Sequence, residues 1–134
     1  MNIGIIGCGN ISPTYFNSHK LYNNFKVVAC ADINEDIAKK SASEFNVSFQ
    51  TVDAILANPN IDIILNLTIP SAHKEIILKT LESGKHSFSE KPLAMNFDEG
   101  KEIYKLAKEK NLYVGCAPDT FLGAVGQKAR EIIE

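Results

Sequence analysis

The sequence predicts an α/β fold built on a doubly wound parallel sheet, and three observations favour this class. Short β-branched runs alternate with helical patterns from the first residue onward. The segments between them are short, as in parallel sheets with right-handed crossovers and helices on both faces. The chain of 134 residues has the length of one folded domain, whose core needs no disulfide or metal to stabilise it.

Six apolar runs are the predicted strands of this sheet. The first, Asn2–Ile6 (NIGII), ends at Gly7 and is typical of a strand buried on both faces. The third is the shortest and has the weakest pattern. The remaining predicted strands, in chain order, cover residues 26–31, 48–50, 61–67, 86–89 and 112–115.

Helix signals separate these strands. Asn34 stands where it can cap a helix over residues 35–45. Helical spacing gives this helix an expected buried face of Ile37, Ala38, Ser41, Ala42 and Phe45.

Two more helices are predicted from their ends. After Pro70, Ser71 opens one of them, and Gly84 stands where a left-handed cap is expected. Asn96, three residues before Glu99, resembles the capping box that starts another. Their expected buried stripes are Ile76, Ile77, Thr80 and Leu81, and then Ile103, Leu106 and Ala107.

A glycine loop, Gly7-Cys8-Gly9-Asn10-Ile11-Ser12, joins the first predicted strand to a helix. Dinucleotide-binding turns need a first glycine for the bend, a second for close approach of the pyrophosphate, and a small third residue for helix–strand packing. Ser12 replaces the usual third glycine. The helix that follows is expected to point its free N–H groups at the phosphates. Taken alone, the pattern is also compatible with an ordinary turn.

Asp32 strengthens the interpretation of this loop as a dinucleotide-binding turn. It ends the second predicted strand, 20 positions beyond Ser12, where a ribose-binding acid is expected. Its carboxylate can accept hydrogen bonds from ribose hydroxyls and repel a 2′-phosphate, and no Lys or Arg follows within three residues. We therefore expect nucleotide binding, with NAD favoured over NADP.

Composition excludes several other classes of function. Fourteen basic against sixteen acidic side chains, with Arg130 as the single arginine, argue against nucleic acid as a partner. No apolar run is long enough to span a bilayer, and no signal peptide is visible. Three widely spaced cysteines predict a reduced, cytoplasmic protein without a disulfide framework or metal site. Cys8 could be a reactive thiolate at a helix N-terminus, but we expect it to be only a small side chain in the variable position of the turn. Cys30 is expected to belong to the core.

Two further polar segments follow neighbouring predicted strands. Residues 68–73 (TIPSAH) come after the fourth strand, and Glu90-Lys91-Pro92 after the fifth. Because ligands of open parallel sheets bind at the carboxyl ends of the strands, both segments should border the cofactor crevice.

The chain resembles the N-terminal domain of the glucose–fructose oxidoreductase, inositol dehydrogenase and MocA (Gfo/Idh/MocA) family of NAD(P)-dependent oxidoreductases. The resemblance runs from Ile3 to about Gly115 and rests on four segments: GIIGCGNIS, CADIN, TIPSAHKEIILKTLESGKH and SEKPLA. It implies an NAD(P)-binding Rossmann fold and hydride transfer between the cofactor and a sugar, cyclitol or related polyol.

The resemblance also implies roles for individual residues. It places Lys91 at the catalytic centre and implies a cis peptide between Lys91 and Pro92. Independently, a cation beside the forming alkoxide of a sugar hydroxyl lowers the barrier to hydride loss. The implied cofactor-binding residues are Gly7, Gly9, Asn10 and Ile11 at the pyrophosphate, Asp32 at the ribose, Thr68, Pro70 and His73 along the crevice, and Glu90 and Lys91 at the nicotinamide ribose and substrate.

Plainer alternatives exist for two of these residues. His73 is equally compatible with an exposed histidine in a first helical turn, and Glu90 with a surface carboxylate. After the sixth strand the sequence departs from the usual family pattern, and Asp119 is a candidate for the polar contact that other members make there.

The expected domain plan is a dinucleotide-binding domain over 1–118, with 119–134 connecting it to a substrate domain that is absent. That domain supplies the family's second acid–base group, which His19, His73 and His86 cannot replace because they belong to the cofactor domain. We therefore expect a truncated chain that binds NAD(H) and turns over little alone, and homo-oligomers formed through apolar surface. The residues expected to form that surface are Phe121, Leu122, Ile132 and Ile133.

Two other functions stay open from the sequence. One is a stand-alone NAD-binding sensor or interaction module without catalysis. The other is a Rossmann-like methyltransferase that binds S-adenosylmethionine through a similar glycine loop, against which Glu90-Lys91-Pro92 argues.

Overall fold

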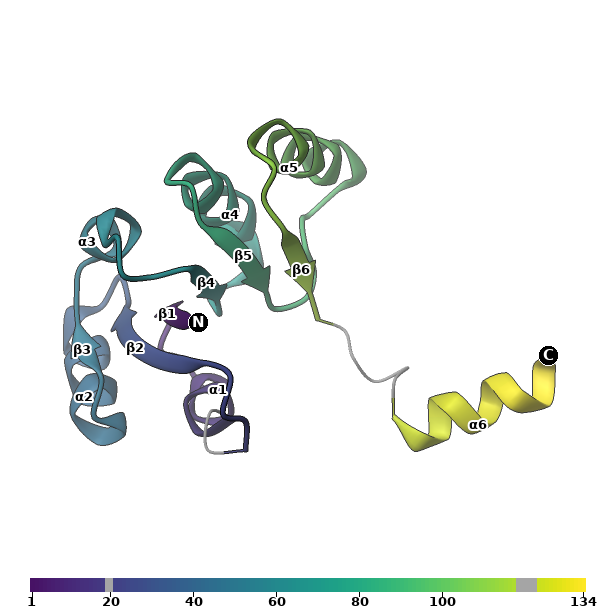
Figure 1. The fold of residues 1–134 in the computed structure, drawn as a ribbon, viewed down its shortest axis with the longest axis horizontal. Helices are drawn as coiled ribbons and strands as arrows, with labels where there is room; N and C mark the ends of the chain where they lie inside the picture. The colour runs from purple at the N-terminus through teal and green to yellow at the C-terminus, as the bar shows by residue number, and fades with distance from the viewer. Residues whose placement is uncertain (19–20, 118–122) are drawn as a thin grey trace.

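A computed structural model describes residues 1–18, 21–117 and 123–134. Its centre is one six-stranded parallel sheet with the order β3-β2-β1-β4-β5-β6, which confirms the predicted doubly wound fold (Figure 1). The strands are β1 (Asn2–Ile6), β2 (Lys26–Ala31), β3 (Ser48–Phe49), β4 (Ile63–Asn66), β5 (His86–Ser89) and β6 (Val114–Cys116).

Helices cover both faces of this sheet. Successive strand residues point to opposite sides, and apolar side chains on both sides are buried beneath helices. Ile5 belongs to the core that packs α1 and α2 against one face, whereas Ile6 belongs to the core beneath α3 on the other face. A third cluster packs α4 against α5. The helices are α1 (Ser12–Ser18), α2 (Glu35–Phe45), α3 (Val52–Ala57), the short 3₁₀ helix η1 (Pro70–Ala72), α4 (His73–Glu82), α5 (Phe97–Lys110) and α6 (Ala124–Ile133).

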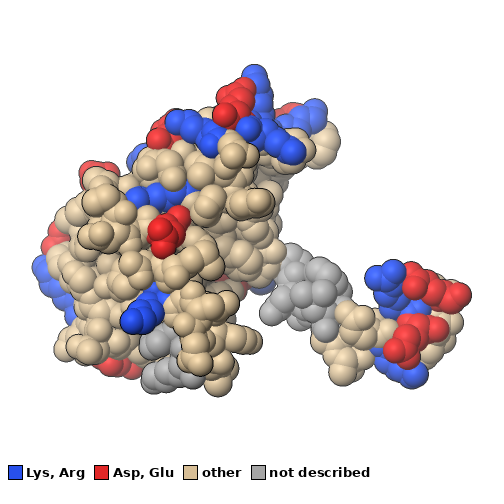
Figure 2. Space-filling view, in the orientation of Figure 1, with Lys and Arg blue, Asp and Glu red and all other residues tan. Residues whose placement is uncertain are grey.

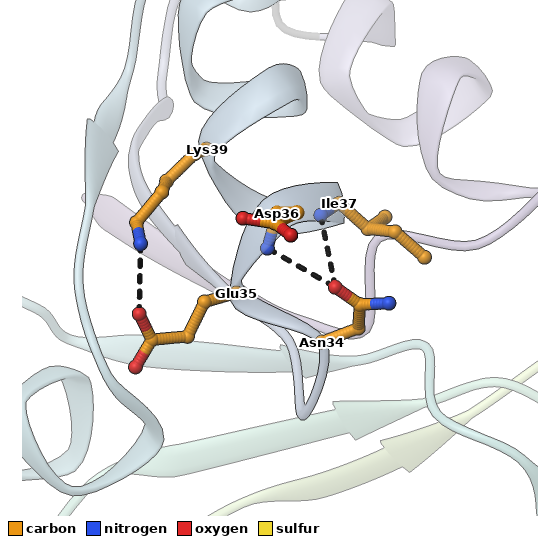
Figure 3. A network of polar contacts seen from close by, with 5 residues as sticks. All are labelled: Asn34, Glu35, Asp36, Ile37 and Lys39. Carbon is orange, nitrogen blue, oxygen red and sulfur yellow. Dashed lines mark hydrogen bonds and ion pairs between the residues drawn. The ribbon is translucent and has the colours of Figure 1, made fainter.

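The start of α2 shows how local sequence sets these helices. Asn34 caps it, because its Oδ1 accepts hydrogen bonds from the backbone N–H groups of Asp36 at 3.1 Å and Ile37 at 3.4 Å (Figure 3). One turn on, the Lys39 ammonium lies 2.9 Å from the Glu35 carboxylate (Figure 3). Asn96 caps α5 in the same way, as predicted.

Several sequence expectations differ from the structure. The short helix α3 was not predicted, although Thr51 caps it by accepting from the Ala54 N–H. The expected buried position of Ile37 is wrong, because its side chain is 43% exposed, whereas Ala38 is fully buried. The strand β4 is shorter than the predicted 61–67, whereas β6 begins two residues later and ends one residue later than the predicted 112–115, since residues 114–116 are the ones that pair with β5.

The edge of the sheet where the strands begin is held by polar side chains. Asn2 donates from Nδ2 to the Asn60 carbonyl at 2.8 Å, and its backbone N–H donates to Asp62 at 2.7 Å. The buried Lys85 ammonium donates to the carbonyls of Asn58 at 2.7 Å and Ile61 at 3.0 Å. Burial lowers the pKa of Lys85 below its ordinary value, and Asp62 opposes that shift. We call this edge the amino edge.

The helix α6 stands apart from the sheet (Figure 1). Three of its apolar side chains, Val125, Ile132 and Ile133, are exposed, whereas Phe121 and Leu122 lie outside the described residues. Acidic and basic side chains are intermixed over the face drawn in Figure 2. Within the described residues, no helix is both long and apolar enough to cross a membrane.

Candidate functional site

The segments singled out from the sequence follow strands that lie side by side in the centre of the sheet. The glycine loop follows β1, Asp32 follows β2, residues 68–73 follow β4, and Glu90 to Pro92 follow β5. Because all strands are parallel, these segments share the edge at which the strands end, which we call the carboxyl edge.

Gly7 and Gly9 have different roles in the loop. Gly7 has a φ of 102°, and a Cβ there would lie 2.5 Å from the backbone carbon of Leu67, so only glycine fits between the neighbouring strand ends. A Cβ on Gly9 would meet no atom within 4 Å. The first glycine therefore permits the bend, and the second leaves open space above the loop.

The end of the loop is ordered by Ser12. Its Oγ donates to the Gly9 carbonyl at 2.8 Å, and its side chain is buried against the strands, as expected of a small third residue. By contrast, among the described residues no acceptor takes the backbone N–H of Gly9, Asn10 or Ile11. Three adjacent donors thus lie beside the open space at Gly9.

Asp32 lies across the base of this loop. Its half-buried carboxylate accepts from the Cys8 N–H at 2.8 Å and from the Asn34 N–H at 2.9 Å. Each carboxylate oxygen has further acceptor capacity. Asp32 therefore joins the loop to the start of α2 while it still offers oxygen atoms at the carboxyl edge.

The loop cysteine is buried. Cys8 and Cys30 are both buried, and donation of a hydrogen bond to Cys30, together with burial, raises the pKa of the Cys8 thiol above its ordinary value. The thiol therefore stays protonated, in agreement with the prediction of a small filler at this position.

Asn66 organises the segment after β4, a role that no sequence motif indicated. Its fully buried amide accepts from the Thr68 hydroxyl at 2.7 Å and from the Thr68 N–H at 3.2 Å, and it donates to the His73 carbonyl at 3.2 Å. Pro70, which is exposed, begins the 3₁₀ turn between them.

His73 connects the segment that follows β4 to the segment that follows β5. Its ring nitrogens lie 2.9 Å from the Thr68 carbonyl and 2.6 Å from the Pro92 carbonyl, and its side chain is 0% exposed. The alternative of an exposed first-turn histidine is therefore wrong. The ring turns inward because two backbone carbonyls from different strand ends converge on it.

Glu90 and Lys91 differ in their surroundings. Glu90 is half-buried rather than a free surface carboxylate, because the Tyr15 hydroxyl donates to its Oε1 at 2.6 Å and the Lys91 N–H donates to its Oε2 at 3.1 Å. The Lys91 side chain is exposed, and its ammonium forms no ion pair within the described residues. The peptide between Lys91 and Pro92 is cis, as expected.

Among the remaining candidates that the structure describes, His86 does not contribute to this edge. His86 begins β5 at the amino edge, where its Nδ1 accepts from the Tyr113 N–H at 3.1 Å. His19 and Asp119 lie outside the described residues. Two hollows of about 430 and 460 Å³ flank α5, share Leu93 and Tyr104, and contain no residue of the glycine loop.

A Rossmann-type dinucleotide-binding domain is the class of protein that this sheet and its carboxyl edge define. The sequence pattern of one family, described as an oxidoreductase family with an NAD-binding Rossmann fold, matches residues 1–117. The chain therefore belongs to the Gfo/Idh/MocA oxidoreductase family, of which it is the NAD-binding domain.

Individual relatives agree with this assignment. The chain is 30% identical over 124 residues to levoglucosan dehydrogenase of Pseudarthrobacter phenanthrenivorans, covering 84% of this chain and 31% of that protein. It is 25% identical over 136 residues to myo-inositol 2-dehydrogenase of Thermotoga maritima, covering 100% of this chain and 41% of that protein. The chain thus spans less than half the length of these curated relatives.

Solved structures share the fold. Biliverdin reductase from Synechocystis, in complex with biliverdin and NADP⁺, superimposes with a TM-score of 0.89 at 29% identity, covering 98% of this chain and 42% of that one. GenD2 from gentamicin A biosynthesis, in complex with NAD, superimposes with a TM-score of 0.92 at 16% identity, covering 98% of this chain and 38% of that one.

Proposed function

We propose that the carboxyl edge binds a nicotinamide adenine dinucleotide, and that NAD(H) is preferred over NADP(H). The observation that carries this proposal is the open space beside Gly9, faced by the backbone N–H groups of Gly9, Asn10 and Ile11. Uncommitted backbone donors are suited to pyrophosphate oxygens, and the missing side chain at Gly9 lets the phosphates approach. The residues present therefore fit the cofactor.

The preference for NAD(H) rests on Asp32. Its carboxylate can accept hydrogen bonds from the adenosine ribose hydroxyls, and its charge opposes a 2′-phosphate. The next three residues, 33–35, contain no basic side chain that could bind that phosphate.

The segments after β4 and β5 complete the proposed site. Thr68 and Pro70 border the proposed crevice, while His73 is buried, with its ring placed between the Thr68 and Pro92 carbonyls. Glu90 is proposed to accept a hydrogen bond from the ribose beside the nicotinamide, and Lys91 to reach the substrate.

We further propose a dehydrogenase chemistry on a sugar, cyclitol or related polyol, supported by what the printed names of the relatives say of those proteins. The nicotinamide ring, when bound, supplies the hydride acceptor or donor. Lys91 is the proposed catalytic residue, since its ammonium stabilises the alkoxide that forms on the substrate oxygen and its neutral amine can accept the proton. This chemistry requires a substrate-binding part, for which the greater length of the relatives leaves room.

The preference is tested by exchanging Asp32→Asn and titrating the protein with NADH and NADPH. Loss of the charge should weaken NADH binding about tenfold while NADPH binding holds or improves, since hydrogen bonds to charged groups contribute about 1.5–3 kcal/mol. Asp36→Asn is the matched control, because it removes the same charge from the exposed start of α2.

An unchanged NADH-to-NADPH affinity ratio in Asp32→Asn would contradict the preference. A wild-type protein that binds neither nucleotide at millimolar concentration would contradict the proposed function itself.

We also propose that the protein is cytoplasmic and self-associates through α6. The support for self-association is the exposure of Val125, Ile132 and Ile133, which are 86%, 76% and 84% exposed. Sedimentation velocity over a wide concentration range should show a mass above the monomer that Ile132→Ser with Ile133→Ser returns to the monomer. A single monomeric species at all concentrations would refute it.

A further inference from the structure

The Glu90 carboxylate is held from a distant part of the chain. Tyr15 lies on α1, 75 positions before Glu90, and its hydroxyl donates to Oε1 at 2.6 Å. Such a short hydrogen bond to a carboxylate is charge-assisted and stronger than one between neutral groups. The other carboxylate oxygen accepts from the Lys91 N–H at 3.1 Å.

These two hydrogen bonds fix the orientation of the carboxylate. One donor comes from α1 and the other from the backbone at the end of β5, so rotation of the Glu90 side chain would break at least one of them. A carboxylate has about four acceptor positions, so lone pairs remain for a ligand in directions that the two donors determine. Tyr15 thereby sets where Glu90 can accept a further hydrogen bond.

The same contact joins two parts of the proposed cofactor site. The helix α1 begins at Ser12, the last residue of the glycine loop, whereas Glu90 directly follows β5, on the far side of β4. The Tyr15 hydroxyl therefore spans from the helix behind the pyrophosphate loop to the segment that carries Lys91.

We propose that Tyr15 is a positioning residue for the nicotinamide half of the cofactor. It holds Glu90 so that the free carboxylate lone pairs meet the ribose beside the nicotinamide, and it thereby orders the backbone that presents Lys91. The inference rests on the proposed function, since it concerns how the same site selects its ligand. It assigns Tyr15 no contact with the adenosine half.

Removing the Tyr15 hydroxyl should leave the fold intact. Phe16, the next residue on α1, is 0% exposed, and its ring stacks on Phe45 with centroids 4.4 Å apart, so α1 is packed by a different side chain. Tyr15→Phe keeps the ring of Tyr15 and removes its hydroxyl, the group that donates to Glu90.

The test compares three nucleotides that differ in the nicotinamide half. ADP lacks the second ribose, ADP-ribose has it, and NAD⁺ has both the ribose and the nicotinamide. In calorimetric titrations, Tyr15→Phe should weaken ADP-ribose and NAD⁺ about fivefold or more, because Glu90 loses its fixed orientation, and should leave ADP binding within about twofold of wild type. Tyr104→Phe, an exposed tyrosine on α5, is the matched control and should change none of the three.

A double-mutant cycle shows whether Tyr15 acts through Glu90. If it does, Tyr15→Phe has no further effect on NAD⁺ binding in a Glu90→Ala background. Additive losses, an equal loss for ADP, or unchanged ADP-ribose and NAD⁺ affinities would each overturn the inference. Failure of the wild-type protein to bind any of the three nucleotides would instead overturn the proposed function, and this inference with it.

Discussion

The two edges of the sheet use similar polar groups in different ways. At the amino edge, the Lys85 ammonium has two carbonyl partners, and Asn2 is bonded through both its amide side chain and its backbone. At the carboxyl edge, the N–H groups of Gly9 and Asn10 have no acceptor among the described residues, and the Lys91 ammonium forms no ion pair there. One edge is bonded internally, and the other presents donors and a cation.

This difference separates the polar groups that stabilise the fold from those that are available to a ligand. The carboxyl edge is not simply loose, because Asn66 and His73 are fully buried and bonded, and they hold the segments that carry the exposed groups. Such an arrangement favours ligand binding. The free donors stand on a support that is already held by internal hydrogen bonds, so binding costs little conformational entropy. Substitutions should therefore affect either stability or affinity, according to which group they change.

The largest expected effects are at the two loop glycines, where substitution of Gly7 should lower stability and substitution of Gly9 should lower NADH affinity. Gly7→Ala places a Cβ against the Leu67 backbone at a left-handed φ, so it should destabilise the protein by about 2–5 kcal/mol. Gly9→Ala meets open space and should change the free energy of unfolding by less than about 1 kcal/mol, while it weakens NADH binding at least about tenfold by filling the space for the pyrophosphate.

Urea denaturation and NADH titration of both variants check this pair. A Gly9→Ala protein that binds NADH like the wild type would show that the open space is not the phosphate site. A Gly7→Ala protein with unchanged stability would show that the close approach to Leu67 has no energetic cost.

A smaller effect is expected at the amino edge, where a substitution should lower stability and leave NADH affinity unchanged. Lys85→Met keeps the apolar stem but leaves the Asn58 and Ile61 carbonyls without their donor, which should cost about 1–3 kcal/mol of stability. NADH affinity should stay within about twofold of wild type, because the site lies at the other edge. Thermal denaturation with parallel NADH titration measures both. A large loss of NADH affinity would break the separation between the two edges.

The sequence predicted the strand–helix order well where the signals are local. The strands β1, β2 and β5 have the predicted bounds, because compact apolar runs end at turn residues such as Gly7. The caps at Asn34 and Asn96 were predicted because a capping side chain and the helix it starts are adjacent in sequence. The helix α3 was missed because its six residues are too few to show helical periodicity.

The contacts within the candidate site depend on distant residues, and the sequence did not reveal them. Tyr15 meets Glu90 across 75 positions, and no spacing rule connects them. The inward position of His73 depends on the Pro92 carbonyl, which belongs to another strand end. Asn66 lies within an apolar run that predicted a strand, and only the turn after β4 shows why an amide is buried there.

The central claim is that the carboxyl edge, and not the amino edge, binds the nicotinamide dinucleotide. At 14.7 kDa the chain is suited to two-dimensional ¹⁵N–¹H NMR, which reports each backbone N–H separately. On titration with NADH, the amide resonances of Gly9, Asn10 and Ile11 should shift in a saturable way, while those of Lys85 and His86 stay in place. Shifts confined to the amino edge or to α5, or no saturable shift at millimolar NADH, would contradict the account.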